Sequence, residues 1–245
     1  MNFRDKFSFG VPELIAHGPI TIVALGDSVT HGSVGFGDEM DYDTVYWNRL
    51  RKKLQAVNEF VPVNMINAGI GGDTATQCLK RLDSQVLAYH PDLVIVCYGL
   101  NDVNHPLESY RESLRTIFAR CQAAGCEVVF LTPNMLNTYV VEDVEERYRE
   151  YSATTAAWQN EGRMDAFMDA AREVAAEAGV AVCDCYAIWK EISRTQDTTR
   201  LLANRINHPT REMHALFADE LYRMLLPDTV GEKAVNSSTM YVDQI

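Results

Sequence analysis

The chain has 245 residues, of which 47% are hydrophobic and 23% charged, a composition typical of one globular α/β core. Its net charge of −12 argues against nucleic acid or an anionic membrane surface as a partner, and its apolar runs fall short of the roughly 18 residues of a membrane-spanning helix. Residues 1–7 mix both charges and lack an apolar core before a small-residue cleavage site, so we expect no secretory signal and a cytoplasmic protein.

Five apolar runs along the chain predict buried strands, at residues 21–25, 61–66, 93–98, 127–132 and 180–183. Helical patterns separate them, at residues 44–57, 75–88, 109–124 and 166–178, and a last one covers about 210–226. Strands that alternate with helices predict a parallel sheet with right-handed crossovers. We expect one domain over residues 1–227 and a polar C-terminal tail at 228–245.

The first predicted strand ends abruptly in Gly26, Asp27 and Ser28. A serine on a tight turn between a strand and a helix holds its hydroxyl clear of the sheet, and the N–H groups that follow converge on one point. Acyl transfer needs this arrangement, because negative charge develops on the carbonyl oxygen beside the nucleophile. The same turn is common as a structural loop, so its interpretation depends on the rest of the chain.

Clusters of small or polar residues also follow later strands. They cover residues 67–74, 99–102 and, near the C-terminus, 204–209. Ligands bind at the carboxyl ends of the strands in open α/β sheets. Together with the first turn, these clusters would bring a hydroxyl, a glycine N–H, a side-chain amide and an imidazole to one edge. These groups are the parts of a serine hydrolase.

On these four segments the chain resembles the SGNH hydrolases, also called the GDSL family of esterases and lipases. The four family blocks stand in the family's order from Gly26 to His208. The resemblance implies Ser28 as nucleophile and His208 as general base. It also implies an oxyanion hole formed by Ser28, Gly72 and Asn101. The implied fold is a flavodoxin-like three-layer α/β/α sandwich with a parallel sheet of about five strands.

The chain departs from the family pattern beside the histidine. The family usually has an aspartate three residues before it, to orient the imidazole, whereas this position is Arg205, which cannot accept a hydrogen bond. The nearest acceptors are Asn204 and Asn207. We therefore expect a Ser-His dyad with a neutral orienting group, with Asn204 preferred over a main-chain carbonyl. A carboxylate from elsewhere, such as Asp197, would instead restore an ordinary triad.

Two acidic residues adjoin the predicted site. We expect Asp27 and Asp102 to hydrogen-bond the turns that aim Ser28 and Asn101. His31 is expected to be a pocket-wall or capping residue rather than a metal ligand or second base. The chain has no metal-ligand or nucleotide-binding motif, so we expect no cofactor and no metal. The six cysteines are expected to be reduced core thiols.

Residues 134–162 are longer than a connection from strand to helix needs. Their acidic run at 142–146 is typical of a solvated helix face. The segment also carries four aromatic residues, which make it a candidate wall of a substrate pocket or a contact in a homodimer: Tyr139, Tyr148, Tyr151 and Trp158.

The favoured function is a serine ester hydrolase that acts on a small-molecule ester, short-chain or a sugar O-acetyl ester. The charged segment after Asn134 does not resemble the exposed apolar lid of an interfacial lipase, which favours water-soluble substrates. Two alternatives stay open. An acyltransferase would use the same residues, and Arg205 at the usual acid position favours a degenerate binding module that has lost its base chemistry.

Overall fold

The computed structural model describes residues 3–35 and 39–227, and in them five parallel strands form one sheet in the order β2-β1-β3-β4-β5. The strands are β1 (Ile20–Gly26), β2 (Val63–Gly69), β3 (Leu93–Cys97), β4 (Glu127–Leu131) and β5 (Ala181–Cys183). The predicted parallel α/β sheet is confirmed. Only β2 differs clearly, since it starts later than expected and includes Asn67, Ala68 and Gly69. As an edge strand it is only partly buried, so polar residues fit within it.

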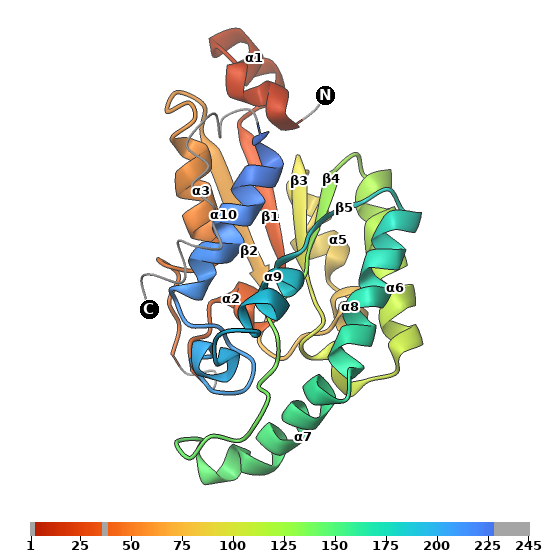
Figure 1. Ribbon diagram of the computed structural model, residues 1–245. Helices are drawn as coiled ribbons and strands as arrows, with labels where there is room; N and C mark the ends of the chain where they lie inside the picture. Colours follow the sequence, from red (N-terminus) through yellow and green to blue (C-terminus); the bar gives the residue numbers. More distant parts are fainter. Residues whose placement is uncertain (1–2, 36–38, 228–245) are drawn as a thin grey trace.

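Helices cover both faces of the sheet and complete the expected three layers (Figure 1). On one side α3 (Tyr46–Gln55) packs against α10 (Met213–Leu225). On the other side α6 (Leu107–Ala123) packs against α8 (Arg163–Glu177). All four helices were predicted to within a few residues, because each presents one apolar stripe to the sheet.

The predicted helix at 75–88 is wrong as a single element. The chain instead forms α4 (Ala75–Cys78), α5 (Leu82–Gln85) and the 3-10 helix η2 (Leu87–Tyr89). Thr74 caps the first piece by accepting a hydrogen bond from the Gln77 N–H. The break leaves Arg81 between α4 and α5, with its side chain turned toward the strand ends.

Several short elements had no clear apolar period and were not predicted. They include α1 (Val11–His17), α2 (Ser28–His31), α7 (Arg149–Asn160), α9 (Cys185–Ile192) and the 3-10 helices η1 (Phe3–Ser8), η3 (Asp102–Asn104), η4 (Glu146–Tyr148) and η5 (Thr198–Leu201). The acidic run at 142–146 is not a helix face, since it forms a turn that leads into η4. In Figure 1, α7 extends beyond the carboxyl edge of the sheet.

Two glycines let α2 sit close against the strand ends. A Cβ at Gly69 would lie 2.6 Å from the carbonyl carbon of Thr30 in α2, and one at Gly26 would lie 2.9 Å from Thr30 Cβ. Both distances are far below van der Waals contact, so any side chain would push α2 away from the sheet. These glycines therefore set where the turn at Ser28 stands.

All six cysteines carry free thiols and are buried, as expected. Burial raises the pKa of the Cys78 and Cys121 thiols to about 12. Across residues 3–35 and 39–227, none of the helices has the length and apolar character that a membrane crossing requires. The predicted tail at 228–245 lies outside the described residues.

Candidate active site

Ser28 is the first residue of α2, at the carboxyl end of β1. The Asp27 side chain caps the helix, because its Oδ1 accepts a hydrogen bond of 3.0 Å from the Val29 N–H. From behind, the hydroxyl of Tyr46 lies 2.9 Å from Thr30 Oγ1, which ties α2 to α3. The serine thus lies on a short helix that Asp27 caps and that a hydrogen bond joins to α3. Its own N–H is at the first helical position and has no carbonyl of α2 to bond.

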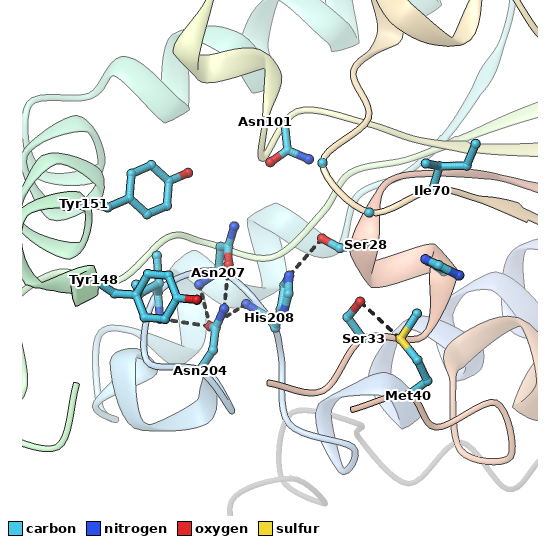
Figure 2. A pocket seen from close by; sticks show the side chains of 14 residues that line it. Ser28, Ser33, Met40, Ile70, Asn101, Tyr148, Tyr151, Asn204, Asn207 and His208 are labelled. Carbon is cyan, nitrogen blue, oxygen red and sulfur yellow. Dashed lines mark hydrogen bonds between the residues drawn. The ribbon is translucent and has the colours of Figure 1, made fainter. Parts of the chain in front are cut away.

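His208 reaches this serine from the far end of the chain. Its Nε2 lies 2.8 Å from Ser28 Oγ (Figure 2). Its Nδ1 lies 2.5 Å from the carbonyl oxygen of Gly35. A carbonyl oxygen can only accept, so Nδ1 carries the proton and Nε2 presents its lone pair to the serine hydroxyl. This is the tautomer that a general base needs.

The expected contact between Asn204 and the imidazole is wrong. Asn204 Oδ1 instead accepts hydrogen bonds from the backbone N–H groups of Ile206, Asn207 and His208, at 3.0, 2.9 and 2.9 Å (Figure 2). Three N–H groups of the turn that leads into the histidine thus share this amide oxygen, and Asn204 shapes that turn. The group that Nδ1 meets is instead the main-chain carbonyl of Gly35, which carries no charge.

Neither charged candidate near the histidine meets the ring. Arg205 has a φ of +61° and turns its guanidinium away, with Nη1 donating to the carbonyl of Leu202 at 2.9 Å and Nε 3.3 Å from Asp143 Oδ2. Asp197 accepts a hydrogen bond of 2.5 Å from the hydroxyl of Tyr139. No triad forms through either side chain.

The two remaining predicted residues border the same space as the serine and histidine. Gly72 has a φ of +76°, a left-handed conformation that favours glycine. Asn101 Nδ2 donates to the carbonyl of Asp73 at 3.0 Å, and its second hydrogen is left for another acceptor. Ser28, Gly72, Asn101 and His208 all line one cavity of about 570 Å³.

Asp27 and Asp102 lie in the turns where they were expected. Asp102 Oδ1 accepts a hydrogen bond of 2.9 Å from the Ala75 N–H, at the start of α4. The other carboxylate oxygen of each residue is buried and has no hydrogen-bond partner among residues 3–35 and 39–227. Burial raises the pKa of both carboxyl groups to about 7. Each carboxyl group therefore changes its protonation state near pH 7.

Burial also lowers the pKa of His208 below its usual range. The hydrogen bond to Gly35 opposes this effect, and the positive charge of Arg211 adds to it. Among the side chains of residues 3–35 and 39–227, no carboxylate raises the pKa of this imidazole. The neutral imidazole is thus favoured, and its Nε2 lone pair faces the Ser28 hydroxyl.

The cavity walls come from both halves of the chain. His31 is a wall residue, as expected, and in the described part of the chain no group of three or more His, Cys, Asp or Glu side chains could hold a metal. Of the four aromatic residues in the segment 134–162, Tyr148 and Tyr151 line the cavity and face it from across Ser28 (Figure 2). The walls also include residues that sequence reasoning did not single out: Ser33, Met40, Ile70, Gly71 and Ile206.

Residues 24–216 match the GDSL-like Lipase/Acylhydrolase family. The chain belongs to this family. Among its relatives is an acetylxylan esterase from Geobacillus stearothermophilus, 24% identical over 221 residues that span 82% of this chain and 92% of that protein. Another is thioesterase 1/protease 1/lysophospholipase L1 from Escherichia coli K12, 27% identical over 159 residues, or 61% of this chain and 69% of that one.

Solved structures agree with this family and fold. A lipase/acylhydrolase from Enterococcus faecalis superposes with a TM-score of 0.63 at 25% identity, over 84% of this chain and 95% of that one. The acetylxylan esterase from Geobacillus stearothermophilus superposes with a TM-score of 0.63 at 22% identity, over 84% and 94%. The chain is thus a carboxylic ester hydrolase, an acylhydrolase of the GDSL type.

Proposed function

We propose that the chain hydrolyses short-chain esters of soluble, hydroxyl-rich alcohols such as O-acetylated sugars, through an acyl-enzyme on Ser28. The observation that carries this proposal is the alignment of Ser28 Oγ, His208 and the Gly35 carbonyl at 2.8 and 2.5 Å. It supplies a hydroxyl, a base in the correct tautomer and a fixed orientation for that base. A catalytically degenerate binding module would not need this alignment.

In the acylation step, Ser28 Oγ attacks the ester carbonyl carbon while its proton passes to His208 Nε2. The carbonyl π electrons move to oxygen, where the Ser28 N–H, the Gly72 N–H and the free hydrogen of Asn101 Nδ2 stabilise the negative charge. The intermediate then expels the alkoxide, which takes the proton from Nε2 and leaves as the alcohol. Water then attacks the acyl-enzyme while its proton passes to His208 Nε2. The new intermediate expels Ser28 Oγ, which takes the proton back, and the acid is released.

The substrate class follows from the cavity and from the relatives. Beside Ser28 the lining is glycine and small polar groups, with single apolar side chains at Met40, Ile70 and Ile206. The tyrosines across the cavity offer aromatic surface to an alcohol. The acetylxylan esterase that matches over most of both chains supports an acetylated sugar as the alcohol part.

The six free thiols support a reducing compartment such as the cytoplasm.

The test compares p-nitrophenyl acetate, butyrate and octanoate, together with acetylated xylo-oligosaccharides, in the parent and in Ser28→Ala. We expect turnover to fall as the acyl chain lengthens, and to be lost in Ser28→Ala. Ser33→Ala is the matched control, because Ser33 is a buried serine of the same cavity whose hydroxyl donates to Met40 Sδ, at 3.5 Å. Full activity in Ser28→Ala, or a preference for octanoate, would contradict the proposal.

An acyltransferase would use the same residues and differs in the acceptor. Adding soluble sugars or glycerol to the assay separates the two outcomes, since transfer produces a new ester whereas hydrolysis produces only free acid. We expect acid as the main product at all acceptor concentrations.

A further inference from the structure

The guanidinium of Arg81 lies beneath the carboxyl ends of three strands. Its Nη1 donates to the carbonyl of Ala68 at the end of β2, at 2.8 Å, and Nη2 to the carbonyl of Gly26 at the end of β1, at 3.4 Å. Nη2 also lies 3.0 Å from the hydroxyl of Tyr98, which directly follows β3. One side chain therefore joins the strand ends from which three of the four site segments depart.

The same guanidinium holds Asp73, the residue after Gly72. Arg81 Nε and Nη2 lie 3.0 and 2.5 Å from Asp73 Oδ2, and the Tyr98 hydroxyl donates to the same oxygen at 2.8 Å. The side chains of Arg81 and Asp73 are only 11% and 6% exposed. Asp73 thus has a fixed carboxylate, and its main-chain carbonyl accepts the amide of Asn101 at 3.0 Å.

We propose that Arg81 is a positioning residue for the oxyanion hole, and this inference rests on the proposed function. It fixes Asp73, and through it the Gly72 backbone on one side and the Asn101 amide on the other. It also anchors Gly26, two residues before Ser28. Arg81 does not line the cavity and so touches no substrate. Oxyanion donors act only when they lie about 2.7–3.1 Å from the developing charge, so small displacements of these loops cost rate.

A purely structural role is the competing explanation. A buried ion pair is weak evidence of stabilisation, since the cost of desolvating both charges offsets their attraction. Losing one partner would still destabilise the protein and lower activity in a general way. The two explanations differ in how Arg81 and Asn101 combine. If two residues act through the same oxyanion hole, the kcat loss of the double variant is smaller than the product of the two single losses. If they act independently, the two losses multiply.

The experiment is a double-mutant cycle with Arg81→Met, Asn101→Ala and the double variant, measuring kcat and KM with p-nitrophenyl acetate. We expect Arg81→Met to lower kcat by about 10²-fold with KM within about 3-fold of the parent, because an oxyanion device serves the transition state. The double variant should lose at most about 10-fold more than Asn101→Ala alone. A loss in the double variant equal to the product of the two single losses, about 100-fold beyond Asn101→Ala alone, would overturn the inference.

Two further variants test whether a loss of kcat comes from lower stability of the fold. Arg81→Lys keeps the charge but not the fork, so we expect a kcat loss of about 10-fold with a melting temperature near that of the parent. Arg172→Met removes a less buried ion pair, to Asp184 at 2.8 Å with side chains 31% and 33% exposed, outside the cavity. It should lower the melting temperature and leave kcat within about 2-fold. An equal loss of kcat in Arg172→Met at equal stability would show that Arg81 acts only through folding.

Failure of the proposed function and failure of the inference about Arg81 give different results. If Ser28→Ala is as active as the parent, the proposed function fails and the inference fails with it. If the parent depends on Ser28 but the cycle is multiplicative, only the inference fails.

Discussion

His208 Nδ1 bonds the main-chain carbonyl of Gly35, at 2.5 Å, where this family usually uses an aspartate. In another serine hydrolase, asparagine in place of the triad aspartate costs about 10⁴ in turnover, because it holds the wrong tautomer. An amide side chain can turn its NH₂ group toward the ring. A carbonyl can only accept, so it holds the productive tautomer without a charge. In the described part of the chain, the imidazole is therefore oriented by a group that gives no charge support to the imidazolium.

The pH profile follows from this neutral environment. Burial lowers the pKa of His208, and the base works only when it is unprotonated. We expect the acid limb of kcat/KM to have its midpoint below the ordinary histidine value of about 6.5. Measuring kcat/KM for p-nitrophenyl acetate between pH 4.5 and 8 checks this. A midpoint above about 7 would require a carboxylate partner for the ring.

Restoring an acid at position 205 should not build a triad. The side chain there points toward the Leu202 carbonyl and Asp143, away from the imidazole. We expect Arg205→Asp to have the same kcat as Arg205→Ala within about 2-fold, since both lose only partly exposed contacts. A gain over Arg205→Ala of about 10-fold, with the acid limb moved to higher pH, would show that the carboxylate reaches His208.

Asp27 should make the protein less stable as the pH rises. In the folded protein its pKa is about 7, whereas an unfolded aspartate has a pKa near 4. Between these values the folded state holds the extra proton, so the free energy of unfolding falls as the pH rises, by up to about 1.4 kcal/mol per pH unit. Asp27→Asn keeps an acceptor for the Val29 N–H and removes this loss.

Urea unfolding at pH 5 and pH 8 measures this effect. The stability of Asp27→Asn relative to the parent should be higher at pH 8 than at pH 5. For the exposed carboxylate control Asp43→Asn, the difference from the parent should be the same at both pH values. A pH-independent difference for Asp27→Asn would mean that this carboxyl group is ionised throughout the range.

Tyr151 should contribute to binding of the alcohol part of the substrate. It lines the cavity opposite Ser28 and does not contact the reacting residues (Figure 2). Tyr151→Ala should raise KM for acetylated xylo-oligosaccharides by about 5-fold, the value of one aromatic contact, with little change for p-nitrophenyl acetate. Tyr139→Ala is the control, since this tyrosine of the same segment is 40% exposed and lies outside the cavity. Equal effects on both substrates would assign Tyr151 to folding of the segment.

The parts of the fold that carry strong apolar patterns could be predicted from the sequence. β3, with five buried residues in succession, and the striped helices α6 and α8 appear nearly where expected. The segment 75–88 has an equally good helical pattern and is nevertheless broken. There the contacts of Arg81 with the strand ends outweigh local propensity, and nothing in the local sequence reveals those contacts.

The site, too, could be predicted from the sequence only in part. Ser28, Gly72, Asn101 and His208, which line one cavity, could be proposed from the sequence because their chemistry depends on residue type and order. The orienting group could not, since every residue has a carbonyl and the one at Gly35 differs from others only in its position. Asn204 was a reasonable side-chain acceptor, but its oxygen is used by three N–H groups of its own turn. Side chains carry signals in a sequence, and main-chain groups do not.

The most direct test of the account is to locate the covalent adduct. The parent, Ser33→Ala and His208→Ala are treated with a fluorophosphonate at pH 7, digested and mapped by mass spectrometry. The account predicts one adduct, on Ser28, formed at equal rates in the parent and Ser33→Ala and lost almost completely in His208→Ala. An adduct on any other residue, or labelling of Ser28 that does not depend on His208, would contradict it.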